Sequence, residues 1–145
     1  NKAFHVVSRI AYEWEGGGWN EWHLAFRDGT SGWLSDAQAE YAVSFPASER
    51  PELPPAKKIA RGQVVRIRNY ELHVTTITRA RYAGVEGELP FEYWDKKEML
   101  FVDLRSSSNG FATIDYSEQP PLFFLGEMVE FDSLRLRNLR QFEGW

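Results

Sequence analysis

The sequence predicts an all-β protein with little helix. Hydrophobic residues alternate with polar ones in several segments, β-branched residues are concentrated in another, and turn-forming residues separate the segments. Residues 20–27 alternate most clearly, because Trp22, Leu24 and Phe26 fall on one face while Glu21 and His23 fall on the other. Many short strands of this kind are usually buried in a small barrel or a two-layer structure.

The remaining strands follow from the same signals. Residues 64–68 alternate, residues 72–82 are rich in valine, isoleucine and threonine, and residues 99–104 and 122–125 are short apolar runs. The polar segment 106–110 is typical of a hairpin tip.

Two segments could be helical. Residues 35–41 could form one or two turns, because Ser35 or Asp36 could serve as an N-cap. Residues 132–142 fit both a strand and a helix, and we favour a strand followed by a turn.

Composition excludes several classes of protein. The chain has 145 residues, 17 Lys and Arg, 21 Asp and Glu, and no cysteine. The length suits one domain or two small, closely packed ones, and the lack of cysteine excludes disulfides and cysteine-ligated zinc. A net charge of −4 argues against nucleic-acid binding. No apolar run could span a bilayer, so we expect no direct membrane insertion, and no opening segment resembles a signal peptide.

The chain divides into two similar halves. Residues 1–6 resemble residues 69–74, and each segment leads to a tyrosine and then to a glycine-rich loop. We therefore predict a first β repeat at 1–46, a proline-rich connector at 47–62, a second β repeat at 63–126 and a C-terminal segment at 127–145. Two unrelated meanders with similar turns are the alternative. The halves would form small barrel-like or two-layer β units.

The second half has an extra first strand, at residues 63–68, that the first half lacks. We expect the first repeat to be truncated at its N-terminus, or its open edge to be filled by another strand. An unpaired edge promotes aggregation, so some cover is expected. The C-terminal segment 127–145 is predicted to pack on the first repeat, with residues 134–138 pairing as the missing strand.

Several runs resemble one known family. They are Tyr-x6-Trp-Asn-Glu-Trp-His-Leu at 12–24, Asp-Gly-x3-Trp-Leu at 28–34, Gly-Glu-Leu-Pro-Phe at 87–91, Phe-Ala-Thr-Ile-Asp-Tyr-Ser at 111–117 and Leu-Arg-Asn-Leu-Arg at 136–140. In this order they resemble the bacterial domain of unknown function family 4178. The resemblance implies a bacterial, cytoplasmic domain within a longer protein, and no established activity.

Aromatic residues give the first candidate site. Trp14 and Trp19 flank the triple glycine at 16–18, and Trp33 follows the next predicted turn. Inward-facing aromatic rings could bind a methylated or polyamine-like cation, and otherwise they would cap the end of a small barrel. Glu21 and His23 share a strand face, a spacing that lets a carboxylate orient an imidazole, although an exposed strand pair is the commoner arrangement.

Charged residues give two further candidates. Glu86 and Glu88 lie on a glycine-rich loop, while Asp103 and Asp115 lie on later strands. A pair of carboxylates can divide the roles of general acid and general base, yet most carboxylates on loops are simply solvated. Asp115 differs, because it lies among apolar residues and a buried carboxylate needs a partner. Four arginines could share a hairpin face and bind an anion, or form an ion-paired outer face: Arg66, Arg68, Arg79 and Arg81.

These residues support three hypotheses. The first is a non-catalytic module that recognises a small cationic ligand or a protein partner. The second is an enzyme, or an enzyme accessory domain, acting on a small polar metabolite such as a polyamine. The third is a structural dimerisation unit. No catalytic residue, metal site or cofactor motif is identified, since the Walker, nucleophile-elbow and HExxH patterns are missing.

Overall fold

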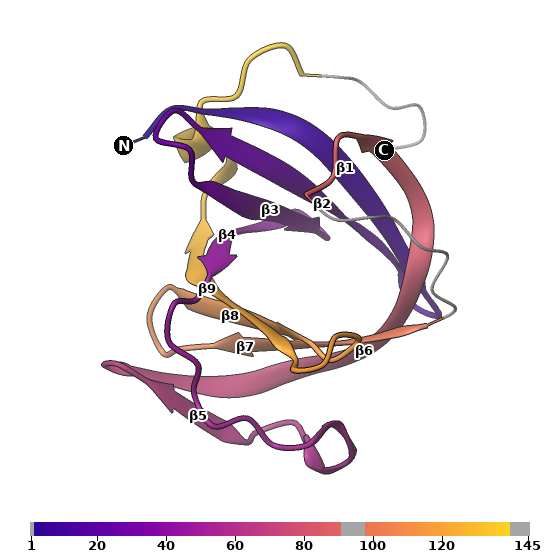
Figure 1. The fold of residues 1–145 in the computed structure, drawn as a ribbon, viewed down its shortest axis with the longest axis vertical. Helices are drawn as coiled ribbons and strands as arrows, with labels where there is room; N and C mark the ends of the chain where they lie inside the picture. The colour runs from indigo at the N-terminus through magenta and orange to yellow at the C-terminus, as the bar shows by residue number, and fades with distance from the viewer. Residues whose placement is uncertain (1, 91–97, 140–145) are drawn as a thin grey trace.

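The chain forms a closed antiparallel β-barrel of eight strands with one additional strand (Figure 1). The computed structural model describes residues 2–90 and 98–139. Its strands are β1 Phe4–Trp14, β2 Gly17–Phe26, β3 Ser31–Ala37, β4 Glu40–Pro46, β5 Val64–Ile67, β6 Tyr70–Gly87, β7 Met99–Arg105, β8 Gly110–Asp115 and β9 Leu122–Val129. The sheet order is β1-β2-β3-β4-β9-β8-β7-β6-β5, and β1 also pairs with β6. The predicted all-β fold with little helix is confirmed.

The long strand β6 closes the barrel. One of its edges pairs with β7, whereas its other edge pairs first with β5 and then with β1. Tyr12 of β1 lies opposite Tyr82, and Val64 of β5 lies opposite His73. A bulge between Val74 and Thr76 interrupts the β6–β7 register, and such a bulge bends a strand. One strand therefore belongs to the barrel and also holds β5 outside it.

The two halves of the chain each supply a four-stranded meander. Strands β1 to β4 lie within the predicted first repeat, and β6 to β9 belong to the second, with β5 as its extra strand. The connector contains only the short 3-10 helix η1 at Ala56–Lys58. Strand β9 continues to Val129, three residues beyond the predicted end of the repeat at 126. Descent of the halves from one duplicated unit stays a prediction.

The helix expected at residues 35–41 is wrong. Strand β3 ends at Ala37 and β4 begins at Glu40, with Gln38 and Ala39 between them at φ of 51° and 63°. Two successive positive φ angles are typical of the tight hairpin turn whose twist matches that of the strands. The residues between these strands lack the Asn-Gly signal of such a turn, so the sequence did not reveal it.

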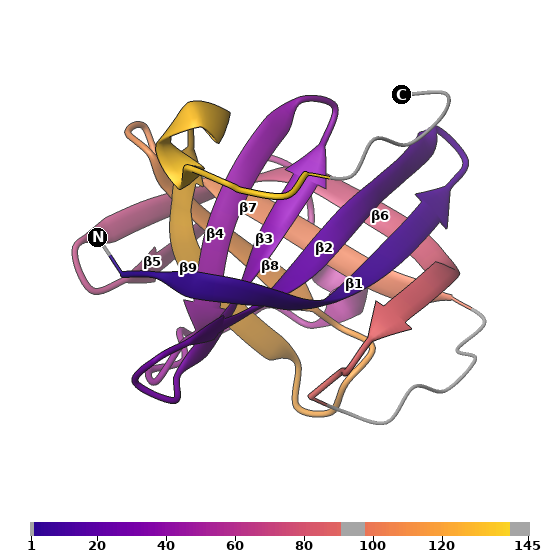
Figure 2. The same ribbon diagram turned by 90° about the horizontal axis from the view of Figure 1, so that it is seen from above.

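The expected pairing of residues 134–138 with the first half is also wrong. The edge of β1 is occupied by β6, and residues 134–138 form no strand; the short 3-10 helix η2, Phe131–Leu134, follows β9 instead. The described part of the C-terminal segment still lies on the outside of the barrel, over β4 and β3 (Figure 2). The ring of Phe131 is 5.2 Å from that of Tyr41 in β4. Residues 140–145 of the predicted segment lie outside the described residues.

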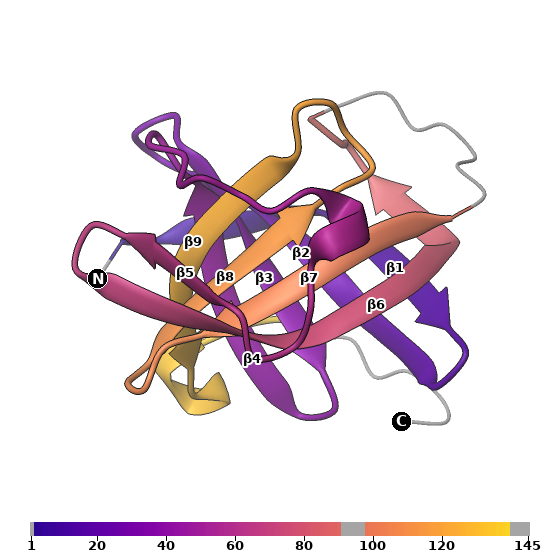
Figure 3. The ribbon, with the colours of Figure 1, turned by 90° about the horizontal axis from the view of Figure 1, so that it is seen from below.

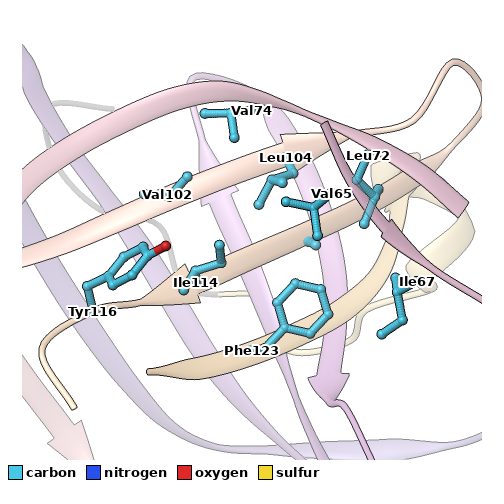
Figure 4. Packing of buried hydrophobic residues seen from close by; sticks show 10 residues of the cluster. Val65, Ile67, Leu72, Val74, Val102, Leu104, Ile114, Tyr116 and Phe123 are labelled. Carbon is cyan, nitrogen blue, oxygen red and sulfur yellow. The ribbon is translucent and has the colours of Figure 1, made fainter. Parts of the chain in front are cut away.

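The main apolar core lies on the outside of the barrel. Seen from below, the connector and β5 lie across β7, β8 and β9 (Figure 3). Val65 and Ile67 of β5 join buried residues of the barrel wall, among them Val102, Leu104 and Ile114, in one cluster (Figure 4). The connector adds Leu53 and Ile59, and the hydroxyl of Tyr116 donates to the carbonyl of Pro54 at 2.7 Å. The outer faces of these strands are therefore covered, and the inner faces need not be apolar.

Neither short helix of the described residues has the length and hydropathy to cross a membrane.

Candidate functional site inside the barrel

Strand register shows which side chains face the interior. Glu21 lies opposite Ile10 and Ser35, and two residues along β2, His23 lies opposite Ser8 and Trp33. Directly opposite residues share a face of the sheet, so these side chains all lie on one side.

Contacts across the barrel identify that side as the inner one. Trp19 of β2 meets Phe101 of β7 edge to face at 5.6 Å between ring centres, and Tyr12 of β1 meets Phe101 at 5.0 Å. Neither β1 nor β2 neighbours β7 in the sheet, so both contacts pass through the interior. Glu21, His23 and Trp33 therefore face inward, while the apolar face of β2 formed by Trp22, Leu24 and Phe26 faces outward.

Aromatic rings fill part of the interior. Tyr12 stacks on Trp19 at 4.8 Å and on Tyr82 at 5.4 Å, and Ile10 and Met99 complete the cluster. Burial is the main cause that raises the pKa of Tyr12 far above its ordinary value, and it raises the pKa of Tyr82 to about 12. Both phenols are neutral at physiological pH and can act as hydrogen-bond donors.

Carboxylates from opposite walls also meet inside the barrel. Glu21 on β2 is half-buried, and burial raises its pKa from 4.5 to about 7. The indole Nε1 of Trp19 donates to Glu21 Oε1 at 3.3 Å and opposes this rise, whereas the carboxylates of Asp103 and Asp115 add to it. Burial also raises the pKa of Asp103 on β7, and hydroxyl groups of Thr113 and Thr76 donate to it and oppose that rise. Asp115 accepts a hydrogen bond from the backbone N–H of Ser117 at 2.8 Å.

Basic side chains are scarce on the inner face. Within the described barrel strands, Arg105 is the single Lys or Arg at an inward position. It lies at the end of β7, where its guanidinium pairs with Glu40 of β4, and both side chains are exposed. The interior therefore places the carboxyl groups of Glu21, Asp103 and Asp115 next to aromatic walls.

His23 and Ser8 form a second polar feature. His23 is 8% exposed and Ser8 is 5% exposed, and they face each other across β1 and β2. The His23 ring lies 4.8 Å from the ring of Trp33. Within residues 2–90 and 98–139, Ser8 Oγ, His23 Nδ1 and His23 Nε2 are buried without a hydrogen-bond partner. Burial lowers the pKa of His23, so the imidazole is neutral at physiological pH.

Five of the eight predicted ligand-site residues reach the inner face. They are Trp19, Glu21, His23, Trp33 and Asp115. The expectation of an exposed Glu21–His23 pair is wrong, because barrel closure turns this face inward.

The other three lie elsewhere. Trp14 is 42% exposed at the end of β1, where its ring lies over Gly16. Glu86 lies 3.6 Å from Arg9, whose cross-strand neighbour Trp22 belongs to the outward face, and Glu88 is exposed just after β6. The glycine-rich loops thus do not bring the predicted ligand-site residues together.

The four predicted arginines form an ion-paired outer surface. Each has a carboxylate within 4.0 Å: Arg66 with Glu71 at 3.3 Å, Arg68 with Glu49 at 3.8 Å, Arg79 with Glu98 at 3.4 Å and Arg81 with Glu13 at 3.0 Å. These exposed pairs correspond to the alternative stated above and leave little unpaired charge for an anion.

Sequence reasoning named Asp103 among the candidate carboxylates without assigning it to the predicted site, and it did not select Tyr12 or Tyr82. A carboxylate inside the apolar run of β7 was the available signal for Asp103, since a charge in such a run needs a partner. The stacking of Tyr12 on Tyr82 depends on the pairing of β1 with β6, which no local pattern indicates. The described residues hold no group of three or more His, Asp and Glu side chains suited to a metal ion.

Together these features define an eight-stranded antiparallel β-barrel with an acidic and aromatic interior. The chain belongs to the family described as Domain of unknown function (DUF4178), whose sequence profile matches residues 1–131. Searches of curated proteins and of solved structures give no match.

Proposed function

We propose that this protein is a non-catalytic recognition module that binds a small organic cation inside its barrel. One observation carries the proposal: the carboxyl groups of Glu21, Asp103 and Asp115 meet in an aromatic interior. Among the described barrel residues, the single inward-facing arginine is Arg105, and it forms an ion pair with Glu40 at the rim.

The energetics favour a cationic ligand. Burial disfavours the ionised carboxylates of Glu21 and Asp103, as their raised pKa values indicate. A bound ammonium group restores the ionised form by charge pairing and by donating hydrogen bonds. The faces of Trp19 and Trp33 add cation–π attraction, which strengthens where water is excluded. A neutral or anionic ligand gains neither contribution.

Size also favours a small ligand. Eight strands enclose an interior just wide enough for side chains or for one small molecule. Glu21, Asp103 and Trp33 face inward and yet are half-buried, so part of their surface stays exposed to solvent. We therefore propose an alkylamine or a short polyamine as the ligand.

The second candidate is an enzyme that acts on the same cation. Glu21 and Asp103 come from different halves of the chain and approach each other closely enough for one carboxylate to raise the pKa of the other. A carboxyl group with a pKa of about 7 suits general acid–base chemistry. Prolonged incubation of each bound amine with the protein, followed by mass spectrometry, separates the two candidates, because a recognition module returns the amine unchanged.

A bacterial and cytoplasmic setting, a protein partner and a homodimer stay predictions. Sedimentation of the purified chain over a concentration series tests the dimer.

The binding experiment compares n-butylamine and putrescine with the uncharged 1,4-butanediol in thermal-shift and calorimetric titrations. A ligand that binds only the folded state raises the melting temperature in a concentration-dependent way, so we expect the amines alone to do so. Glu21→Gln and Asp103→Asn should each weaken amine binding roughly 10- to 100-fold, the range for a hydrogen bond to a charged group. Binding should tighten as the pH rises through about 7, where Glu21 ionises.

The matched control is Glu127→Gln. Glu127 is exposed on β9, opposite Val43 and Gly110 on the outward face, so this substitution should leave amine binding unchanged. Equal shifts with butanediol, or full affinity in both inward-facing variants, would refute the proposal.

A further inference from the structure

Ser8 Oγ and both ring nitrogens of His23 find no hydrogen-bond partner in the part of the chain that the structure describes. Buried polar groups in folded proteins are nearly always hydrogen-bonded, because leaving one unsatisfied destabilises the folded state. Here three such atoms occur together, on two residues that face each other across β1 and β2. Both side chains are more than nine-tenths buried and both face the barrel interior.

The pair lies at a defined position relative to the carboxylate. His23 and Glu21 are two residues apart on the inner face of β2, a separation of about 6.6 Å at the usual rise of a strand. The ring of Trp33 packs beside the imidazole at 4.8 Å. A ligand whose ammonium group pairs with Glu21 therefore places a group four or five bonds further along its chain beside Ser8 and His23.

We propose that Ser8 and His23 form a hydrogen-bonding subsite for a hydroxyl group carried by the cation, so that the preferred ligand is an amino alcohol. This inference rests on the proposed function, since it assigns the second end of the ligand bound at Glu21.

The chemistry of the pair selects a hydroxyl group. A neutral imidazole offers one N–H donor and one nitrogen acceptor, and the serine hydroxyl offers both functions. A ligand hydroxyl can donate to one and accept from the other, which satisfies buried atoms that now lack partners. A second ammonium group would find only acceptors of weak basicity here, and a carboxylate would be repelled by Glu21 and Asp103. A buried water molecule is the competing occupant, because it too both donates and accepts.

The test compares 4-amino-1-butanol with n-butylamine, which has the same carbon chain without the hydroxyl group. On the native protein we expect the amino alcohol to bind about tenfold more tightly, the effect of one or two new hydrogen bonds. In His23→Phe, which keeps an aromatic ring, and in Ser8→Ala, this preference should fall to about twofold or less. His23→Gln retains a donor and an acceptor and should keep part of the preference.

A second readout follows the imidazole directly. Amino alcohol binding should move the ¹⁵N resonances of the His23 ring and leave those of His5 and His73, which are exposed, unchanged. Circular dichroism and melting temperature show whether each variant is folded. The ¹⁵N measurement on the native protein needs no variant, so it decides the question even if His23→Phe fails to fold.

The outcomes separate this inference from the proposed function. If both amines bind equally well and the His23 resonances do not move, the subsite is refuted, water occupies the pair, and the cation site survives. If neither amine binds, the proposed function and the subsite both fail. If the preference for the hydroxyl group persists in His23→Phe and in Ser8→Ala, the hydroxyl is recognised elsewhere and the subsite is refuted.

Discussion

Replacement of Glu21 by glutamine should stabilise the protein at alkaline pH and have little effect in acid. Below pH 4.5 the carboxyl group is protonated in the folded and the unfolded chain, so it contributes no pH dependence. Between pH 4.5 and about 7 the unfolded chain releases a proton that the folded barrel retains. The free energy of unfolding therefore falls as the pH rises through this window, and it levels off above about 7.

The magnitude follows from the raised pKa. A rise from 4.5 to about 7 corresponds to about 3 kcal/mol, and contact of the half-buried carboxyl with solvent reduces this to about 2 kcal/mol. Glutamine retains an oxygen that can accept the hydrogen bond from Trp19 Nε1, so the substitution removes the ionisation and little else. Glu21→Gln should thus be more stable than the native protein by about 2 kcal/mol at about pH 8.

Urea denaturation of both proteins near pH 4.5 and at about pH 8 provides the assay, with the slope of the transition checked for constancy. The control is again Glu127→Gln, whose side chain is exposed on the outside of the barrel. A difference between Glu21→Gln and the native protein that does not change with pH would refute the reasoning. It would mean that Glu21 ionises in the folded barrel as freely as in water.

Two further predictions concern the barrel wall. Leu104→Ala should destabilise the protein by about 2–5 kcal/mol, because Leu104 is fully buried in the cluster between β5 and the barrel; an equal stability in urea denaturation would contradict this. Gly126→Ala should prevent β4 and β9 from pairing and closing the barrel, because a Cβ atom at Gly126 would lie 1.8 Å from the carbonyl oxygen of Val43. A native circular dichroism spectrum and melting temperature would show this prediction to be wrong. The matched control is Gly84→Ala, where a Cβ atom meets nothing within 4 Å.

The strands of this protein were largely predictable from local patterns. Alternation marked β2 and β5, β-branched residues marked β6, and the proline-rich segment marked the connector, because each signal depends on residues that are close in sequence. The turn between β3 and β4 was missed, since Gln38 and Ala39 adopt positive φ angles without glycine or asparagine.

The candidate site was predicted in part. Sequence reasoning assigned five residues of the inner face to the site: Trp19, Trp33, Glu21, His23 and Asp115. It considered Asp103 without assigning it to the site, and it missed Tyr12 and Tyr82. The predicted site lay at the glycine-rich loops, and an exposed position was considered the commoner arrangement for Glu21 and His23. The register of β2 explains this error, because alternation separates two faces of a strand without indicating which one a closed barrel encloses.

By itself, the sequence determined the all-β class, the two meanders, the extra strand β5 and the acidic, cysteine-free composition, because these properties reside in residue types and short-range periodicity. Only the tertiary structure decided that β6 pairs with β1, since no local sequence pattern in either strand indicates which distant strand it pairs with. That single pairing closes the sheet, places the apolar face of β2 outside and Glu21 and His23 inside, and brings Glu21 and Asp103 together from opposite walls.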